Sequence, residues 1–367
     1  MLYAVIMAGG AGTRLWPESR RDRPKQLLEI QGDRTMIQAT VDRLGDLVPL
    51  ERIVIATTDD LAGTIGEQLS QLPRESILCE PCPRNTAPCI GLAAIRILRE
   101  DPDATMAVLP ADHVIEPPEA FRAAIRFAAA LVDQRPQRLV TFGIRPSYPA
   151  EGFGYIEREA PLGAEVAASF DEPPAAYRVK QFREKPDAAT AQQYLEAGTF
   201  YWNAGIFLWK ARTIMNALEQ FQPDTFAHLQ TIAEAADRPE FAEILHREFA
   251  EVNRISIDYA VMERAAEVVV VEAPFAWDDV GSWRALERLR QADPDGNVID
   301  AAKHFELNAR GSIVRATDAG HAVVLVGVED LVVIVTPDAT LVANKRDEES
   351  IRKAIEKLGA AGLGDYL

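Results

Sequence analysis

Residues 3–28, YAVIMAGGAGTRLWPESRRDRPKQLL, combine an apolar run, a glycine-rich segment and two separated cations. The glycines of the GGAG segment leave backbone N–H groups open to a phosphate, because glycine has no Cβ and permits a positive φ. Arg14 can bind two phosphate oxygens at once, and Lys25 supplies a compact positive charge. The stretch therefore predicts a loop that binds phosphate groups.

The spacing of this loop differs from two common phosphate-binding motifs. A Walker A loop needs Gly-Lys-Ser/Thr, and a dinucleotide fingerprint needs a third glycine after Gly-x-Gly. The segment Gly10-Ala-Gly-Thr-Arg14 meets neither requirement.

The loop resembles the opening of the sugar-nucleotide pyrophosphorylases, which join a nucleoside triphosphate to a sugar 1-phosphate. The resemblance rests on GG-x-G-T-R-L-x-P at residues 9–17 and PK-x-L at residues 24–27. The longer pattern GTRLWP-x-SR with PKQ is similar to the mannose-1-phosphate guanylyltransferase branch of that family. The length of the chain fits the short form of this branch, without the C-terminal isomerase domain of a longer form.

Apolar runs and helical periodicity alternate along the first part of the chain. This alternation indicates right-handed βαβ units, a parallel sheet and ligands at the carboxyl ends of its strands. The resemblance implies a Rossmann-like, GT-A-like nucleotidyltransferase fold, an α/β fold with a mixed, mainly parallel sheet and helices on both faces. The predicted strands are 3–7, 52–56, 76–79, 105–109 and 139–143, and the predicted helices are 35–47, 60–69 and 89–99. Further along the chain, residues 221–249 and a segment that begins at Ser256 are also predicted to be helical.

The segment Arg84-Asn-Thr-Ala-Pro88 stands directly before a predicted helix. Asn85 or Thr86 can cap that helix, whose first N–H groups would then face a ligand. In the resembled family this segment lies on the nucleotide base and ribose. The resemblance therefore implies a nucleotide site made of Ala8, Gly9, Gly10, Gly12, Thr13, Arg84, Asn85, Thr86 and Ala87.

Two carboxylates are candidate ligands for Mg²⁺. Asp112 follows a buried strand in the segment PADH, which resembles the metal-binding turn of the family. The family pattern W-x-D-x-G-[ST]-W places a second ligand at Asp279, although the sequence leaves the adjacent Asp278 open. The resemblance implies that Arg14, Lys25 and Asp112 are catalytic, with Arg14 on the leaving pyrophosphate and Lys25 on the α-phosphate.

Three further motifs resemble the sugar side of the family site. They are EGFGY at residues 151–155, EKP at residues 184–186 and YWNAGIF at residues 201–207. Phe153 stands where the family usually has Tyr, and Asp258 in SIDYAVME receives only a structural role. The implied sugar-phosphate site consists of Gly154, Tyr155, Glu184, Lys185, Asn203 and Gly205, with Lys185 on the sugar phosphate.

The character of the chain changes after residue 292. We predict a catalytic domain over residues 1–292 and a small β-rich module over residues 293–367, with strands near 312–315, 322–326, 331–335 and 340–343 and a closing helix at 348–358. By analogy with the family, the module is expected to be a short left-handed β-helix. Its apolar faces make it a candidate surface for a homodimer.

Composition narrows the remaining possibilities. A formal net charge of −17 argues against a nucleic-acid or anionic-membrane partner. The opening residues contain neither a basic signal region nor a long apolar span, so we expect a cytoplasmic protein. Cys79, Cys82 and Cys89 lack a fourth ligand nearby and are expected to be reduced thiols without a functional role.

The resemblance predicts transfer of GMP from GTP to mannose 1-phosphate, with release of pyrophosphate. A sugar 1-phosphate is already anionic, so its oxygen can attack the α-phosphorus without a general base. Two alternatives are another sugar 1-phosphate or nucleotide at the same site, and a non-catalytic regulatory protein that binds GDP-mannose. Retention of Arg14, Lys25, Asp112 and Asp279 together argues against the second.

Overall fold

The computed structural model describes residues 1–10, 13–163 and 169–367. The chain forms two compact units, each built from several segments. The predicted domain boundary after residue 292 concerns consecutive stretches of the sequence, whereas the compact units combine separate stretches, so this boundary stays a prediction. Unit 1 contains Met1–Gly9, Thr40–Ala111 and Ile115–Trp277, and unit 2 contains Gly10–Ala39, Asp112–Val114 and Asp278–Leu367.

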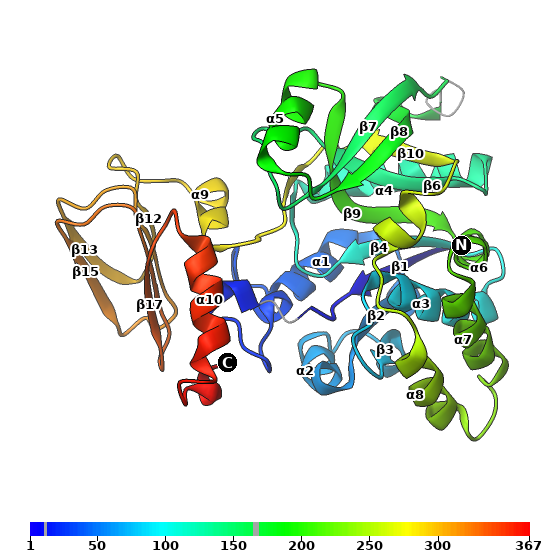
Figure 1. Ribbon diagram of the computed structural model, residues 1–367, viewed down its shortest axis with the longest axis horizontal. Helices are drawn as coiled ribbons and strands as arrows, with labels where there is room; N and C mark the ends of the chain where they lie inside the picture. Colours follow the sequence, from blue (N-terminus) through cyan, green and yellow to red (C-terminus); the bar gives the residue numbers. More distant parts are fainter. Residues whose placement is uncertain (11–12, 164–168) are drawn as a thin grey trace. The chain divides into compact units, whose positions relative to one another are not determined.

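Unit 1 is built on a sheet of nine strands in the order β3-β2-β1-β4-β9-β6-β10-β8-β7 (Figure 1). The strands are β1 (Leu2–Met7), β2 (Ile53–Thr58), β3 (Ile77–Glu80), β4 (Thr105–Pro110), β6 (Leu139–Ile144), β7 (Gly154–Pro161), β8 (Ala176–Glu184), β9 (Phe200–Lys210) and β10 (Val268–Glu272). Two short strands, β5 (Val114–Glu116) and β11 (Ala276–Asp278), form a separate pair.

The sheet is mixed, as predicted. Strands β3, β2, β1 and β4 run parallel, with Val5 of β1 opposite Val54 of β2 and Val108 of β4. All three valines are buried, which explains why these strands appear in the sequence as continuous apolar runs. Strand β9 lies antiparallel between β4 and β6, and β10 returns to a parallel pairing with β6.

Helices cover both faces of this sheet, which confirms the predicted fold class. Helix α3 contacts β1 and β2 and packs with α6 and α7, whereas α4 contacts β4, β6 and β9. Tyr3 and Val5 belong to the core under α3, so the alternate residues of β1 point to the other face. The helices are α1 (Met36–Leu44), α2 (Asp59–Gln68), α3 (Thr86–Glu100), α4 (Pro118–Gln134), α5 (Ala188–Ala197), α6 (Ala211–Phe221), α7 (Pro223–Glu234) and α8 (Phe241–Glu251).

Two segments differ from the helical pattern of the sequence. The region 221–249 is not one helix, because α7 ends at Glu234 and α8 begins at Phe241, on either side of Pro239. Proline removes a backbone donor and clashes with the preceding turn of a helix. The segment after Ser256 forms a π-helical turn over Asp258–Met262 instead of an α-helix.

The C-terminal part of unit 2 is a stack of short parallel strands, as predicted. Strands β12, β14 and β16 pair in parallel, β13 pairs in parallel with β15, and β17 closes the stack antiparallel to β16. The handedness of the stack stays a prediction. The elements are β12 (Val298–Asp300), β13 (Lys303–Leu307), β14 (Ile313–Ala316), β15 (Ala322–Val326), β16 (Leu331–Val335), β17 (Thr340–Asn344), α9 (Leu286–Leu289) and α10 (Glu348–Leu358).

The segment that follows the glycine loop packs against this β-helical stack. Leu15 and Leu28 share one core with Trp283, Ile313 and Ile334, and all five are almost fully buried. Within the described ranges, every helix is too short or too polar to cross a membrane.

Candidate active site

Lys25 forms the centre of a charged cluster in unit 2. It opens a short 3₁₀ turn directly after Pro24, and its side chain is only 10% exposed. Its Nζ donates to Asp112 Oδ2 at 2.7 Å and also donates to the backbone carbonyl oxygen of Asp279. The structure therefore brings together three of the residues that the sequence singled out.

The two carboxylates of this cluster respond differently to their surroundings. Burial opposes ionisation of Asp112, but the positive charges of Lys25 and His113 outweigh it and lower the pKa of Asp112. Burial raises the pKa of Asp279. The positive charge of Lys25 lowers it in part, whereas the negative charges of Asp278 and Asp112 add to the rise. Asp279 thus lies in a place where an additional cation would be stabilising.

The neighbouring carboxylate, Asp278, forms an ion pair with Arg288. It is buried, and it accepts hydrogen bonds from Nε and Nη2 of Arg288 and from the Val280 N–H. Asp279 instead accepts from the N–H of Gly281 at 3.2 Å. Of the two candidates, Asp279 is therefore the one whose charge lies beside Lys25 and Asp112.

The donor set suits Mg²⁺. Mg²⁺ is usually held by one or two carboxylates, with waters and substrate phosphates completing its coordination. Asp112 and Asp279 supply two such carboxylates. No group of three or more His, Cys, Asp or Glu side chains arranged to hold a metal occurs among the described residues. A metal here would therefore depend on its substrate for further ligands.

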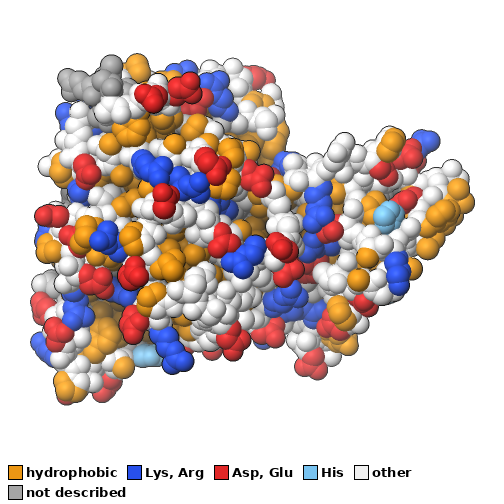
Figure 2. All heavy atoms as spheres, turned by 180° about the vertical axis from the view of Figure 1, so that it is seen from behind, with side chains coloured by type: hydrophobic (Ala, Val, Ile, Leu, Met, Phe, Trp, Pro, Cys, Tyr) orange, Lys and Arg blue, Asp and Glu red, His pale blue; other side chains and the backbone are white. Residues whose placement is uncertain are grey.

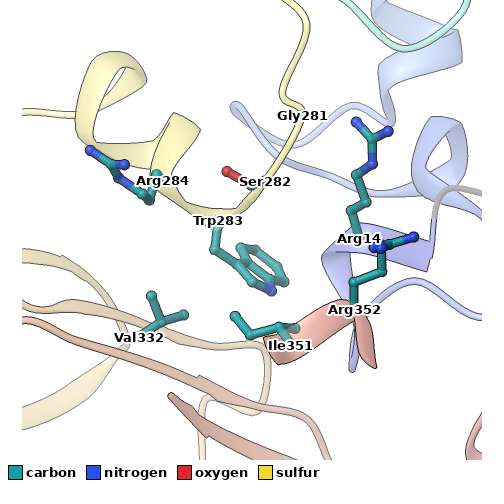
Figure 3. A pocket seen from close by; sticks show the side chains of 8 residues that line it. All are labelled: Arg14, Gly281, Ser282, Trp283, Arg284, Val332, Ile351 and Arg352. Atoms are coloured by element: carbon teal, nitrogen blue, oxygen red, sulfur yellow. The ribbon is translucent and has the colours of Figure 1, made fainter. Parts of the chain in front are cut away.

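Arg14 lines a pocket of about 310 Å³ in unit 2 (Figure 3). Two arginines that the sequence analysis did not single out, Arg284 and Arg352 of α10, line the same pocket together with Trp283. Each pairs with a carboxylate on its own helical segment, Arg284 with Glu287 at 3.6 Å and Arg352 with Glu356 at 3.4 Å. Three arginines line the pocket, and their positive charge suits it to an anion.

The pocket adjoins the Lys25 cluster through Gly281. This residue lines the pocket, and its N–H binds the carboxylate of Asp279. A Cβ at Gly281 would lie 2.9 Å from Asp279 Oδ2, so a larger residue would displace that carboxylate. The two features thus form one continuous charged region of unit 2.

The glycine loop begins where β1 ends. The N–H of Ala8 donates to Ala56 O at 2.7 Å, and its carbonyl accepts from Thr57 Oγ1 at 3.1 Å. Ala8 is therefore anchored in the sheet, whereas Gly9 and Gly10 are exposed. Gly12 lies outside the described residues, and Thr13 begins the short 3₁₀ turn that carries Arg14.

The segment before α3 is tied down by several hydrogen bonds within unit 1. Asn85 has a positive φ of 70°, and its side chain accepts from the Thr86 N–H at 2.8 Å. Thr86 Oγ1 accepts from the Ile257 N–H, and Arg84 donates to the carbonyl oxygen of Ala250. The N–H of Ala87 donates to Ile255 O at 3.1 Å. Arg84 and Thr86 thus hold the loop in place, and the predicted nucleotide contact stays a prediction.

The motifs assigned to the sugar converge in unit 1. Strand β7 begins at Gly154, where a Cβ would lie 2.5 Å from Glu184 Oε2 and 3.5 Å from Asn203 Cβ. Asn203 donates to Asp258 Oδ1 at 3.0 Å and accepts from Thr141 Oγ1 at 3.1 Å. A side chain at position 154 would therefore displace the carboxylate of Glu184 from its place beside Asn203.

Asp258 is a member of this cluster that the sequence analysis treated as structural. Burial and the negative charge of Glu184 raise the pKa of Asp258 to about 6. Its only signal in the sequence was its place in SIDYAVME, and a π-helical turn, which that pattern does not reveal, carries its side chain to Asn203. The carboxylates of Asp258 and Glu184 can accept hydrogen bonds from hydroxyl groups, and the amide of Asn203 can both donate to them and accept from them.

Three other predicted sugar residues have different surroundings. Lys185 is 60% exposed and pairs with Glu184 at 3.0 Å. Gly205 has a φ of 67°, and its N–H binds Asn203 Oδ1 at 3.2 Å. The ring of Tyr155 is fully buried and packs against Tyr194, so a sugar could meet this residue only at its backbone.

The sequence matches two protein families. It matches the family described as Nucleotidyl transferase over residues 3–296 and that described as MannoseP isomerase/GMP-like beta-helix domain over residues 302–358. Together with the mixed sheet and the stacked strands, these matches define the class: a nucleotidyltransferase domain followed by a β-helix domain.

Relatives narrow this class. The chain is 41% identical over 371 residues to the mannose-1-phosphate guanylyltransferase of Klebsiella pneumoniae, a match that covers 100% of this chain and 76% of that protein. It is 42% identical over 363 residues to an Escherichia coli protein of the same name, with 98% and 74% covered. The chain therefore belongs to the mannose-1-phosphate guanylyltransferase family, as its motifs predicted.

A solved structure with a related name is similar to this chain over nearly its whole length. It is described as a mannose-1-phosphate geranyltransferase from Thermus thermophilus, and it shares 35% sequence identity with this chain. The TM-score is 0.85, and the match covers 98% of this chain and 99% of that one.

Proposed function

We propose that this chain transfers GMP from GTP to mannose 1-phosphate, producing GDP-mannose and pyrophosphate. The names of its relatives support this reaction. The observation that carries it is the cluster in which Lys25 contacts Asp112 and Asp279, next to a pocket lined by Arg14. Release of pyrophosphate that requires GTP, mannose 1-phosphate and Mg²⁺ together would test it, and release without the sugar phosphate would contradict it.

The reaction calls for positive charge more than for a base. An oxygen of the anionic sugar phosphate attacks the α-phosphorus of GTP, a new P–O bond forms, and the bond to the β-phosphate breaks with its electrons on pyrophosphate. The central difficulty is to bring polyanions together and to stabilise charge in the transition state. We assign Lys25 to the α-phosphate and Arg14 to the leaving pyrophosphate.

We also propose that Asp112 and Asp279 hold Mg²⁺. When bound, the ion would neutralise phosphate charge and help to orient the α-phosphate. The burial of Asp279 supports this role, because burial and the neighbouring carboxylates Asp278 and Asp112 raise its pKa even with Lys25 beside it. Arg288 binds both oxygens of Asp278, which leaves Asp279 as the better placed ligand of the two.

For the sugar phosphate, we propose that Lys185 contacts the phosphate and that Glu184 and Asn203 contact the sugar hydroxyls. Lys185 is exposed, and its partner Glu184 is mostly buried, at 60% and 13% side-chain exposure. A surface lysine held next to a buried carboxylate can turn to an arriving phosphate at little cost. Asp258 joins this set through its hydrogen bond with Asn203.

We propose a homodimer formed through the β-helical stack. Phe305 and Leu307 of β13 lie opposite Val324 and Val326 of β15, and all four side chains are at least 50% exposed. Figure 2 shows hydrophobic side chains gathered on the surface of this module. Replacing Phe305 with Ser should lower the mass in analytical ultracentrifugation, and a monomeric parent protein would contradict the proposal.

A cytoplasmic location is also proposed. The three cysteines are free thiols, and thiols persist in a reducing compartment. Fractionation of cells that express the tagged chain would test the location.

A further inference from the structure

The pocket that contains Arg14 has a further basic side chain that comes from the C-terminal module, Arg352 of α10. Arg14 and Arg352 lie on one side of the pocket, and Arg284 lies on the opposite side (Figure 3). Helix α10 also contacts the short turn that carries Arg14. Of these three arginines, the proposed reaction has so far used Arg14 alone.

Buried side chains hold the walls of this pocket in place. Trp283 is buried, and its indole N–H donates to the carbonyl oxygen of Trp16 at 2.9 Å. Trp16 follows Arg14 by two residues, so this bond fixes the end of the turn. Ile351, which directly precedes Arg352, is buried as well and anchors the start of α10. The backbone of Arg352 is therefore held beside the turn of Arg14.

The guanidinium group of Arg352 can turn to a ligand at little cost. It pairs with Glu356 of the same helix at 3.4 Å, and both side chains are more than half exposed. Exposed pairs of this kind contribute little to stability. A guanidinium group can bind two oxygens of one phosphate, which is a stronger interaction than the pair that it would replace.

The order of charges along the pocket matches a chain of phosphates. Gly281 borders the pocket, and its N–H binds Asp279, whose carbonyl oxygen accepts from Lys25. We have assigned Lys25 to the α-phosphate and Arg14 to the leaving pyrophosphate. Arg352 lies on the side of the pocket away from Gly281 (Figure 3). A phosphate chain that starts at Lys25 and passes Arg14 therefore reaches Arg352 with its last phosphate.

We propose that Arg352 binds the γ-phosphate of the nucleoside triphosphate and keeps this contact in the pyrophosphate product. This inference rests on the proposed function, since it needs a triphosphate in the pocket. The γ-phosphate is the terminal one and carries more ionisable oxygens than the α- or β-phosphate. With Arg14 and Arg352 side by side, each phosphate of the leaving group meets an arginine. The C-terminal module thus supplies a substrate-binding residue.

Equilibrium binding of GTP and GDP isolates the γ-phosphate, because the two nucleotides differ in that group alone. Loss of a charged hydrogen-bonded contact should weaken binding by roughly tenfold to a hundredfold. Arg352→Ala should therefore raise the Kd of GTP by that factor and leave the Kd of GDP unchanged. Arg352→Lys keeps the charge but loses the two-oxygen geometry, so its Kd for GTP should lie between those of the parent and the alanine variant.

The reverse reaction gives a second readout. With GDP-mannose and pyrophosphate as substrates, Arg352→Ala should raise KM for pyrophosphate by roughly tenfold or more and leave KM for GDP-mannose unchanged. A purely structural role for Arg352 would change both values together.

Arg346→Ala is the matched control. Arg346 is another exposed arginine of the C-terminal module with a carboxylate partner, Asp330 at 2.6 Å, and it is not among the described residues that line the pocket. This variant should keep the parent's preference for GTP over GDP. An unchanged preference in Arg352→Ala that thermal unfolding shows to be folded, or equal losses for GTP and GDP, would overturn the inference. A reduced preference in a protein whose parent forms no nucleotide sugar would support the γ-phosphate contact and overturn the proposed function.

Discussion

Two lysines that the motifs assign to the substrates have opposite surroundings. Lys25 is buried and fixed by two oxygen acceptors, whereas Lys185 is exposed with one carboxylate partner. A preorganised cation such as Lys25 can act on charge that develops in the transition state. An exposed cation such as Lys185 fits ground-state binding of mannose 1-phosphate.

We expect the two alanine variants to separate in steady-state kinetics. Lys25→Ala should lower kcat by on the order of 10²–10³ with a smaller change in KM for GTP. Lys185→Ala should mainly raise KM for mannose 1-phosphate. Lys180→Ala, which removes another exposed lysine paired with Glu157, is the control and should change neither. A Lys185→Ala variant that weakened only GTP would reverse the assignment.

The adjacent carboxylates predict a second contrast. Asp278→Asn removes the buried charge that pairs with Arg288, whose side chain is 40% exposed, so it should lower the free energy of unfolding by about 1 kcal/mol and leave the Mg²⁺ requirement intact. Asp279→Asn should keep the fold but lower activity by at least roughly 10- to 100-fold and raise the Mg²⁺ concentration required. Thermal unfolding and Mg²⁺ titrations check both, and the reverse pattern would shift the metal site by one residue.

Asp258 predicts a pH effect on stability. Its pKa is raised from 3.8 to about 6 in the folded protein by burial and by Glu184. Folding thus favours the protonated form of Asp258. Its contribution to the free energy of unfolding is fully present below pH 4 and is lost as pH rises through 6. At pH 8, Asp258→Asn should therefore be more stable than the parent by about 2 kcal/mol, after allowance for partial exposure. Equal pH dependence of Tm in both proteins from pH 4 to 7 would argue against it.

At the scale of elements, a buried ion pair joins the segment after the glycine loop to the β-helical stack. Arg315 of β14 binds Glu18 through Nε at 2.5 Å and Nη2 at 3.0 Å, with side-chain exposures of 8% and 1%. It also donates to the carbonyl oxygen of Glu29 at 2.7 Å. The C-terminal module therefore helps to fix the segment that carries Arg14 and Lys25.

Glu18→Ala should destabilise the protein by about 1–3 kcal/mol, because Arg315 would remain buried and keep, among the described residues, only Asp300 and the Glu29 carbonyl as partners. Urea denaturation measures this loss, and activity should fall with it, since Lys25 lies in the same segment. Asp46→Ala removes an exposed carboxylate near Arg126 and should change little. If Glu18→Ala lowered the free energy of unfolding as little as the control does, the Glu18–Arg315 pair would not stabilise the segment after the glycine loop.

The sequence predicts elements well where local pattern and burial agree. Strands β1 and β4 were evident because they are covered on both faces and continuously apolar. The break between α7 and α8 was missed because alanine-rich periodicity continues across Pro239.

At the scale of the whole molecule, family motifs located chemistry that no periodicity could reveal. The sequence left Asp278 and Asp279 as alternatives, and the binding of Arg288 to both oxygens of Asp278 supports the proposal of Asp279. The pocket arginines Arg284 and Arg352 belong to no motif. Helix α10 contacts the turn that carries Arg14, which brings Arg352 close to Arg14.

The central claim is that this chain joins GMP to mannose 1-phosphate. Its most direct test is competition among GTP, ATP, UTP and dTTP for mannose 1-phosphate and Mg²⁺, with the nucleotide sugars separated and quantified. The account predicts GDP-mannose as the main product, with kcat/KM for GTP more than about tenfold above that for each other nucleotide, because polar groups in a base-specific site stay unpaired with the wrong base. Comparable kcat/KM for UTP or dTTP, or no nucleotide sugar at all, would contradict it.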